Sequence, residues 1–281
     1  MTAPAVARTR VQPLGWWRMT LSQVLLSQRV FWQDIAFAVV GALMPIAMAL
    51  APILAYRHET TADGSRSIAA YLLPGGMVAA TIWIMYTTVN SACRRRDLRI
   101  YKRLRATPLP GSAILAGEAI SAALPAIAQA VIVLVVGMRL TSAPFPRDLP
   151  LLLVGMLLAA ATFAMLSLGL SGLLPSGEVS TWLITPVVFL LWYCSGAITP
   201  LSGLPRWLAD ISVYLPSTAA VQLARTAWFG QDFVFADGSG DLSALHTLAL
   251  CWRPVLVLLA WTAVGIVVWR RFFRWDPRHS S

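Results

Sequence analysis

The sequence predicts an all-α membrane protein with six transmembrane helices. Hydrophobic residues make up 58% of the chain and charged residues only 12%, a composition too apolar for a soluble domain. Six apolar runs are each long enough to cross a hydrocarbon core as a helix, for which roughly 20 residues suffice. The alternating strands of a membrane β-barrel would be shorter and half polar. The six runs are residues 35–56, 68–92, 112–138, 149–174, 179–200 and 248–269.

The basic residues predict how these spans are oriented. If both termini are cytoplasmic, the inner segments hold fifteen basic and five acidic residues, and the outer segments hold seven of each. Cytoplasmic loops of membrane proteins carry such an excess of Lys and Arg. This asymmetry accounts for the whole net charge of +10, so we expect no nucleic-acid partner. We expect one membrane domain over residues 35–270, between cytoplasmic segments 1–34 and 271–281.

An amphipathic helix is expected before the first span, within "PLGWWRMTLSQVLLSQRVFWQDIA". A Trp-rich face opposite arginines is typical of a helix that lies in the membrane interface; packing on a cytoplasmic partner is the alternative. The apolar side holds Leu14, Trp17, Leu21, Val24, Leu25, Phe31 and Trp32, and the polar stripe holds Arg18, Ser22, Arg29 and Gln33.

Short outer helices are expected between the fifth and sixth spans. Pro200, Pro205 and Pro216 divide this stretch, because proline ends or kinks a helix. The first piece, "RWLADISVYL", places Trp207, Leu208, Ile211 and Tyr214 on one side and suggests a helix in the outer leaflet. A second helix follows at residues 217–228, and then a polar loop with a turn at "DGSG".

The sequence contains no motif for intrinsic catalysis. A Walker A loop needs Gly-Lys-Ser/Thr, but the single lysine, Lys102, is followed by Arg103. His58, His246 and His279 are scattered, so neither a zinc site nor a Ser-His hydrolase is indicated. We therefore expect a non-enzyme without catalytic residues, metal or cofactor of its own. Glu118 is the one acid well inside a predicted span, and we favour pairing with basic side chains over a substrate or proton site.

A basic cluster follows the second span in "CRRRDLRIYKRLRATPLP", with seven Arg and Lys residues. Leu98, Tyr101 and Leu104 recur every third residue, which predicts a short helix with an apolar ridge. The prolines of "TPLPG" then end the helix. Orientation alone does not require such a ridge, and it would suit a groove on a partner protein.

Two stretches resemble the permeases of ABC-2-type transporters. "LRIYKRLRATPLP" is similar to the stretch in which a basic helix of that family ends in "l-atP-l". "SGAITPLSGLPRWLADISVYLPSTAAVQLAR" is similar to the pattern "SG-x3-P-x3-LP-x-WL…LP…R" after the family's fifth span. Members commonly start the first stretch with a Glu-Arg-Glu-x-Gly-like motif, where this chain has "RRRDLRI". Within the family, the chain most resembles daunorubicin-type resistance exporters and lipo-oligosaccharide nodulation exporters.

The resemblance implies the permease half of an ATP-binding-cassette exporter in a bacterial plasma membrane. Two permease subunits, identical or different, would form the pathway, and two copies of a cytoplasmic ATPase subunit would bind ATP and magnesium. The basic helix would be the coupling helix, which transmits closure of the ATPase by rigid-body movement. Its residues would be Arg96, Asp97, Leu98, Arg99, Tyr101, Lys102, Leu104 and Arg105.

We expect the substrate to be an amphipathic small molecule, as in multidrug efflux or antibiotic resistance, or a lipid-linked molecule. A polysaccharide or teichoic-acid exporter is the alternative within the family. Outside it, the alternative is a non-transporting anchor whose basic helix binds anionic lipid or a partner. Aromatic and polar side chains of the spans are candidates for the substrate pathway, with helix packing and interface anchoring as the competing interpretation. They are Trp83, Tyr86, Asn90, Glu118, Trp192 and Tyr193.

Overall fold

The computed structural model describes residues 15–60, 67–141, 143–236, 238, 240–273 and 275. Within these residues the chain forms twelve α-helices, one 3-10 helix and an isolated β-bridge between Thr60 and Ser67. The fold over this part of the chain is therefore all-α, as the sequence predicts.

Among the described residues, six helical segments are long and apolar enough to cross a membrane, which confirms the expected number of spans. The second consists of α3 and α4, which meet at a break in the helix at Trp83. This span continues to Asp97, beyond the expected end at residue 92, whereas the fifth ends at Cys194, short of residue 200. The segments are α2 (Ile35–Ala55), α3 (Ile68–Ile82) with α4 (Ile84–Asp97), α6 (Gly111–Thr141), α7 (Leu149–Ser171), α8 (Gly177–Cys194) and α12 (Trp252–Phe272).

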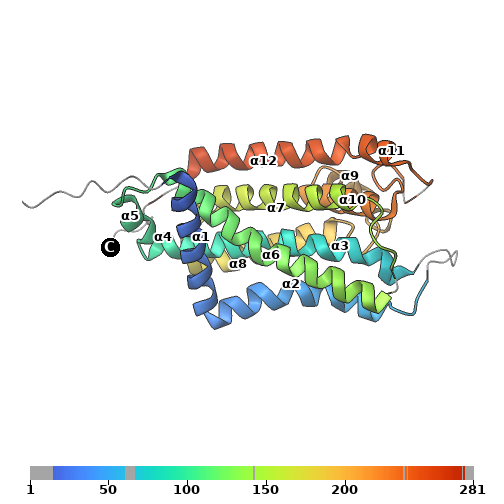
Figure 1. Cartoon of the computed structure of the whole chain (residues 1–281), viewed down its shortest axis with the longest axis horizontal. Coiled ribbons are helices and arrows are strands. Elements are labelled where there is room, and N and C mark those ends of the chain that lie inside the picture. Colours follow the sequence, from blue (N-terminus) through green and yellow to red (C-terminus); the bar gives the residue numbers. More distant parts are fainter. Residues whose placement is uncertain are drawn as a thin grey trace, which may run out of the picture.

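The spans run side by side along the long axis of the molecule (Figure 1). The α3 helix lies at the centre and is buried along nearly its whole length, packed against α2, α6, α7 and α10. The outward faces of α2, α8 and α12 carry many exposed apolar side chains, which suit contact with lipid or another membrane subunit.

The tightest seam of the bundle joins α7 to α12. A Cβ atom at Gly265 would lie 2.7 Å from the backbone nitrogen of Leu166 and 2.8 Å from the carbonyl carbon of Met165. Small residues allow helices within membranes to approach this closely. The backbone contact here therefore depends on Gly265 having no side chain.

We expect Gly265→Val to destabilise the protein by about 1–3 kcal/mol, because the new side chain must push two helix backbones apart. Thermal unfolding of the purified protein in detergent measures the change. Ala263→Val adds the same branching at an exposed position of α12 and serves as the control. Equal melting temperatures for the two variants would contradict the close seam.

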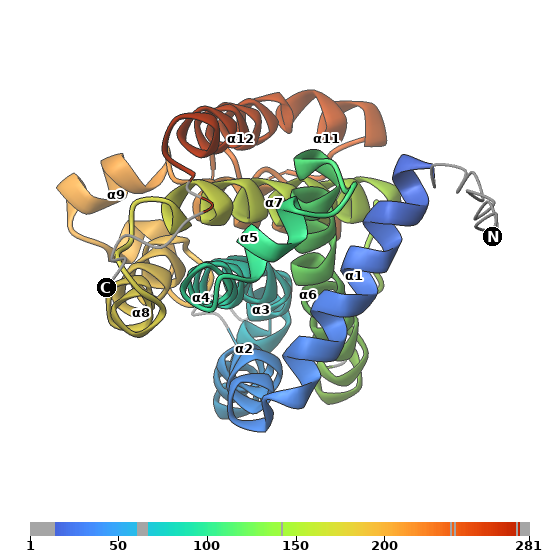
Figure 2. The same cartoon turned by 90° about the vertical axis from the view of Figure 1, so that its left-hand side faces the viewer.

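One end of the bundle gathers most of the positive charge, and we call it the basic end. The ends of α4, α7 and α12 and the starts of α6 and α8 meet there, together with the short helix α5 (Ile100–Arg105) (Figure 1). Helix α1 (Trp16–Gln33) lies across this end at a steep angle to the spans, as Figure 2 shows from that side.

The α1 helix packs on α6 through Thr20, Gln23, Val24 and Ser27. Gln28 Nε2 donates a hydrogen bond of 2.6 Å to the carbonyl oxygen of Ser121 on α6. The expected apolar side is mostly exposed and carries Trp17, Leu21, Leu25 and Trp32, but Val24, expected on that side, faces the bundle instead. Small and polar residues hold α1 in place, so its large apolar residues remain available to the membrane interface.

The opposite end carries the short segments η1 (Leu201–Gly203), α9 (Arg206–Ser212), α10 (Pro216–Phe229) and α11 (Ala244–Leu250). Trp207 and Ile211 of α9 are exposed, as an interfacial helix requires. The α10 helix is present as expected, but it is buried in the bundle along nearly its whole length rather than lying on its surface. Arg225 of α10 stacks over the Tyr71 ring at 3.9 Å and donates to the carbonyl oxygen of Ala197 at 3.1 Å.

Candidate functional site

The basic cluster forms two helices rather than one. The α4 helix ends at Asp97, Arg99 adopts a left-handed backbone conformation (φ 56°), and α5 starts at Ile100. This conformation is uncommon for a residue other than glycine and costs about 1–2 kcal/mol. The junction therefore interrupts the helical spacing on which the sequence prediction depends.

This break separates the expected ridge of Leu98, Tyr101 and Leu104. Leu98 is 54% exposed, Leu104 is half-buried, and Tyr101 is completely buried within the chain. The prediction of one continuous apolar ridge is therefore wrong. The exposed residues of the junction are instead Asp97, Leu98 and four basic residues, namely Arg99, Lys102, Arg103 and Arg105.

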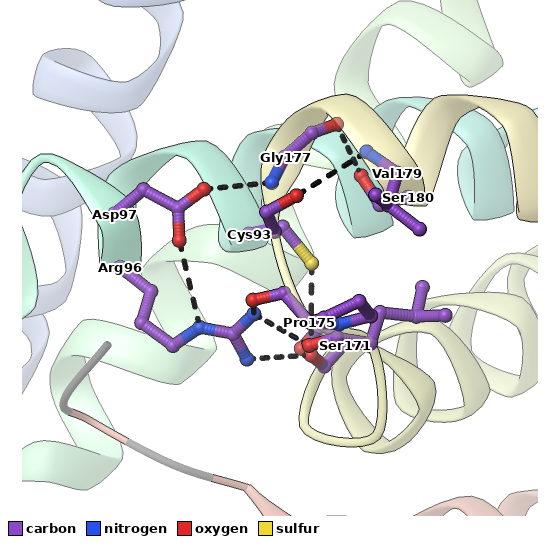
Figure 3. Close-up of polar contacts among 10 residues, drawn as sticks. Cys93, Arg96, Asp97, Ser171, Pro175, Gly177, Val179 and Ser180 are labelled. Carbon is purple, nitrogen blue, oxygen red and sulfur yellow. Dashed lines mark hydrogen bonds and ion pairs between the residues drawn. The ribbon is translucent and has the colours of Figure 1, made fainter. Parts of the chain in front are cut away.

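Arg96 is buried at the end of α4 and binds the end of α7 (Figure 3). Its guanidinium donates to the carbonyl oxygen of Ser171 at 2.8 Å, of Leu174 at 2.7 Å and of Pro175 at 3.3 Å. The last carbonyl groups of a helix lack partners within the helix and form its negative end. Arg96 satisfies the carbonyl group of Ser171, the last residue of α7, with a positive charge, and it also binds the connection that follows.

The neighbouring Asp97 binds the start of α8. Its carboxylate accepts a hydrogen bond of 2.7 Å from the backbone nitrogen of Gly177, the first residue of that helix (Figure 3). A carboxylate is favourable at the positive N-terminal end of a helix. Arg96 and Asp97 therefore hold both sides of the connection between α7 and α8.

Arg95 forms a buried ion pair with Glu118 on α6. The same guanidinium nitrogen donates to the hydroxyl of Ser27 on α1 at 2.9 Å. This contact is the pairing with the basic cluster that we favour for Glu118 from the sequence. The two contacts connect α4 to α6 and α1.

Arg94 pairs with Asp34, which caps the start of α2 by accepting from the backbone nitrogen of Phe37 at 3.2 Å. Hydrogen bonding to Arg94 holds the pKa of Asp34 below its usual range. Four consecutive side chains, residues 94–97, therefore contact α2, α6, α7 and α8 in turn. We call these four side chains the α4 strap.

A cleft of about 790 Å³ opens beside the α4 strap, between α4 and the starts of α2 and α8. The sequence did not predict this cleft, because the residues that line it are distant from one another in the chain. Phe31 and Phe37 supply part of its apolar wall, and Arg94, Asp97, Glu178 and Thr181 supply polar groups.

Asn90 lines the same cleft and is almost completely buried. Its side-chain oxygen accepts from Ser180 at 2.7 Å and from Thr181 at 3.0 Å. Within the described residues its side-chain nitrogen has no hydrogen-bond partner. A buried donor in that state favours a ligand or water that offers an acceptor.

The other candidate pathway residues lie in different places. Trp83 contacts Tyr86 and Phe189, at ring-centre distances of 5.0 Å and 6.2 Å, and Phe189 contacts Trp192 at 6.4 Å. These aromatic side chains join the second span to α8. Glu118 is turned toward Arg95, and Tyr193 is half exposed on the outer face of α8.

Within the described part of the chain, six helices that are long and apolar enough to cross a membrane define a multi-pass membrane protein. Within the described residues no group of three or more His, Cys, Asp and Glu side chains is placed to hold a metal ion. The sequence profile of the ABC-2 type transporter family matches residues 16–229, and the chain belongs to this family. Its members are membrane transport subunits, which are not catalytic proteins on their own.

Nodulation protein J of Sinorhizobium fredii (strain NBRC 101917 / NGR234) is a relative of this chain. The two sequences are 30% identical over 191 residues, which cover 66% of this chain and 68% of the relative.

Proposed function

We propose that this protein is the permease subunit of an exporter driven by ATP hydrolysis on separate ATPase subunits. Two permease subunits would form the pathway, and two ATPase copies would bind at the basic end, which lies in the cytoplasm. The observation that carries the proposal is the α4 strap, because it connects the exposed α4–α5 junction to four other helices. A force applied at the junction would reach the spans through these polar contacts, of which those of Arg95 and Arg96 are buried.

The exposed surface of the junction supports docking of an ATPase there. Leu98 offers an apolar contact, and Arg99, Lys102 and Arg103 surround it with positive charge. The same charges would place the basic end in the cytoplasm, since Lys and Arg are retained on that side of the membrane. This surface replaces the continuous ridge expected from the sequence.

The cleft supports an amphipathic substrate, such as a drug-like or lipid-linked molecule, that approaches from the inner leaflet. Its aromatic wall would hold an apolar group, and Asn90 and Thr181 would bind a polar one. Ligand sites commonly combine a largely apolar wall with a few well-placed polar groups. The substrate would then pass between α2 and α8 as the strap moves those helices.

We expect Lys102→Glu/Arg103→Glu to weaken binding of the ATPase by about tenfold or more, because the variant reverses two exposed charges at the docking surface. The measurement is the amount of ATPase that co-purifies with the chain, together with ATP-dependent uptake of a fluorescent amphipathic dye into inverted membrane vesicles.

Arg139→Glu/Arg206→Glu is the matched control, since it reverses two exposed charges away from the junction. Both variants should be present in the membrane at the wild-type level. Normal ATPase binding and dye uptake by Lys102→Glu/Arg103→Glu would rule out docking on α5.

A further inference from the structure

The buried side of α5 is covered by residues that follow α12. The Tyr101 ring lies 5.9 Å from the ring of Phe273 and 5.9 Å from that of Trp275, measured between ring centres. Phe273 and Trp275 are 5.1 Å apart and meet edge to face. The guanidinium of Arg105 also lies over the Trp275 ring, at 5.3 Å.

Two glycines, Gly172 and Gly111, leave room for the residues after α12 at this position. The α12 helix ends at Phe272, and Phe273 adopts an extended conformation. A Cβ atom at Gly172, just after α7, would lie 2.3 Å from the carbonyl oxygen of Phe272. At the start of α6, a Cβ atom at Gly111 would lie 3.2 Å from the Trp275 ring. Phe273 and Trp275 are thus seated between the ends of three helices.

The α5 helix depends on these contacts. It has only six residues, and a helix of that length is not stable in water without packing. Tyr101 is its buried residue, and burial raises the pKa of this phenol well above its usual range, so the ring stays neutral. Edge-to-face aromatic pairs stabilise a contact beyond the effect of the area they bury.

We propose that Phe273 and Trp275 form a latch that fixes α5 to the end of α12, and that they act as positioning residues for the coupling of ATP hydrolysis to transport. The α4 strap contacts α2, α6, α7 and α8, and α3 belongs to the same span as α4. The latch adds α12, so every span is connected to the junction on which the ATPase docks. The coupling role rests on the proposed function, whereas the latch itself can be tested without an ATPase.

The test uses the full chain with Phe273→Ala/Trp275→Ala. Trp252→Ala/Phe272→Ala is the matched control, because it also removes one Trp and one Phe side chain, both of which are exposed on α12. Spin labels are placed at the exposed positions 103 and 271, while the native Cys93, Cys194 and Cys251 are buried. Without an ATPase, we expect a narrow distance distribution for the wild type and the control. For the latch variant we expect a broad distribution.

The second measurement uses the complex with its ATPase and labels at the exposed positions 178 and 271, on α8 and α12. We expect ATP to change this distance in the wild type and the control but not in the latch variant, which should still stimulate the ATPase.

A narrow 103–271 distribution in the latch variant overturns the latch. An unchanged ATP response between positions 178 and 271 in that variant overturns its role in coupling. If no ATPase binds the wild-type chain, the proposed function fails and the coupling role with it, while the first measurement still decides whether the latch exists.

Discussion

Replacing Glu118 with leucine is expected to destabilise the protein by about 3–5 kcal/mol, because it leaves the buried guanidinium of Arg95 without its opposite charge. Both side chains are more than nine-tenths buried, so water cannot substitute for the lost partner. Thermal or denaturant unfolding of the purified protein measures the loss.

The double variant Arg95→Met/Glu118→Leu is expected to recover much of that stability. Apolar side chains of similar volume often replace a buried ion pair without a net cost. Ser27, a residue of α1, would lose only one hydrogen bond, and the other contacts of α1 with α6 remain. If the double variant is no more stable than Glu118→Leu, the unpaired charge of Arg95 is not the cause of the lost stability.

The adjacent ion pair gives an internal comparison. Arg94 and Asp34 are 63% and 31% exposed, and exposed pairs contribute about 0–1 kcal/mol. Arg94→Gln should therefore change stability far less than Glu118→Leu, although the two arginines are neighbours in the sequence. A similar loss in both variants would mean that burial does not determine the energies of the α4 strap.

Hydropathy and length were sufficient to predict the six spans, and amphipathic spacing predicted the helix before them, because each of these depends on a local pattern. The pairing of Glu118 with the basic cluster was also predictable, because an acid within an apolar span requires a partner. The partners of Arg94, Arg95 and Arg96 were not, since three adjacent arginines look alike in a sequence. Their different roles arise only because three separate helices, α2, α6 and α7, lie beside them in the folded chain.

Tyr101 shows a second limit of the sequence. Its spacing from Leu98 and Leu104 predicted exposure on a common ridge, but the left-handed Arg99 breaks that spacing. Tyr101 is buried by Phe273 and Trp275, which are far along the chain and belong to no motif. A long-range contact of this kind leaves no periodic pattern, and the same holds for the cleft beside Asn90.

Arg96→Met is expected to have the largest effect on transport. The methionine fills much of the space, but it offers no hydrogen bond to the carbonyl groups of Ser171, Leu174 and Pro175. Hydrogen bonds to a charged group contribute about 1.5–3 kcal/mol each, and a buried carbonyl left without a partner adds a penalty. We expect the connection between α7 and α8 to loosen and ATP-driven export to fall by about tenfold or more.

The comparison with Arg96→Lys separates charge from geometry. A lysine keeps the positive charge near the end of α7, but its single ammonium cannot reproduce the planar fork that spans several carbonyl groups. Arg96→Lys should therefore lie between the wild type and Arg96→Met in both melting temperature and export. Wild-type export by Arg96→Met, at normal membrane levels and with normal ATPase binding, would show that movement reaches α7 and α8 by a route other than the α4 strap.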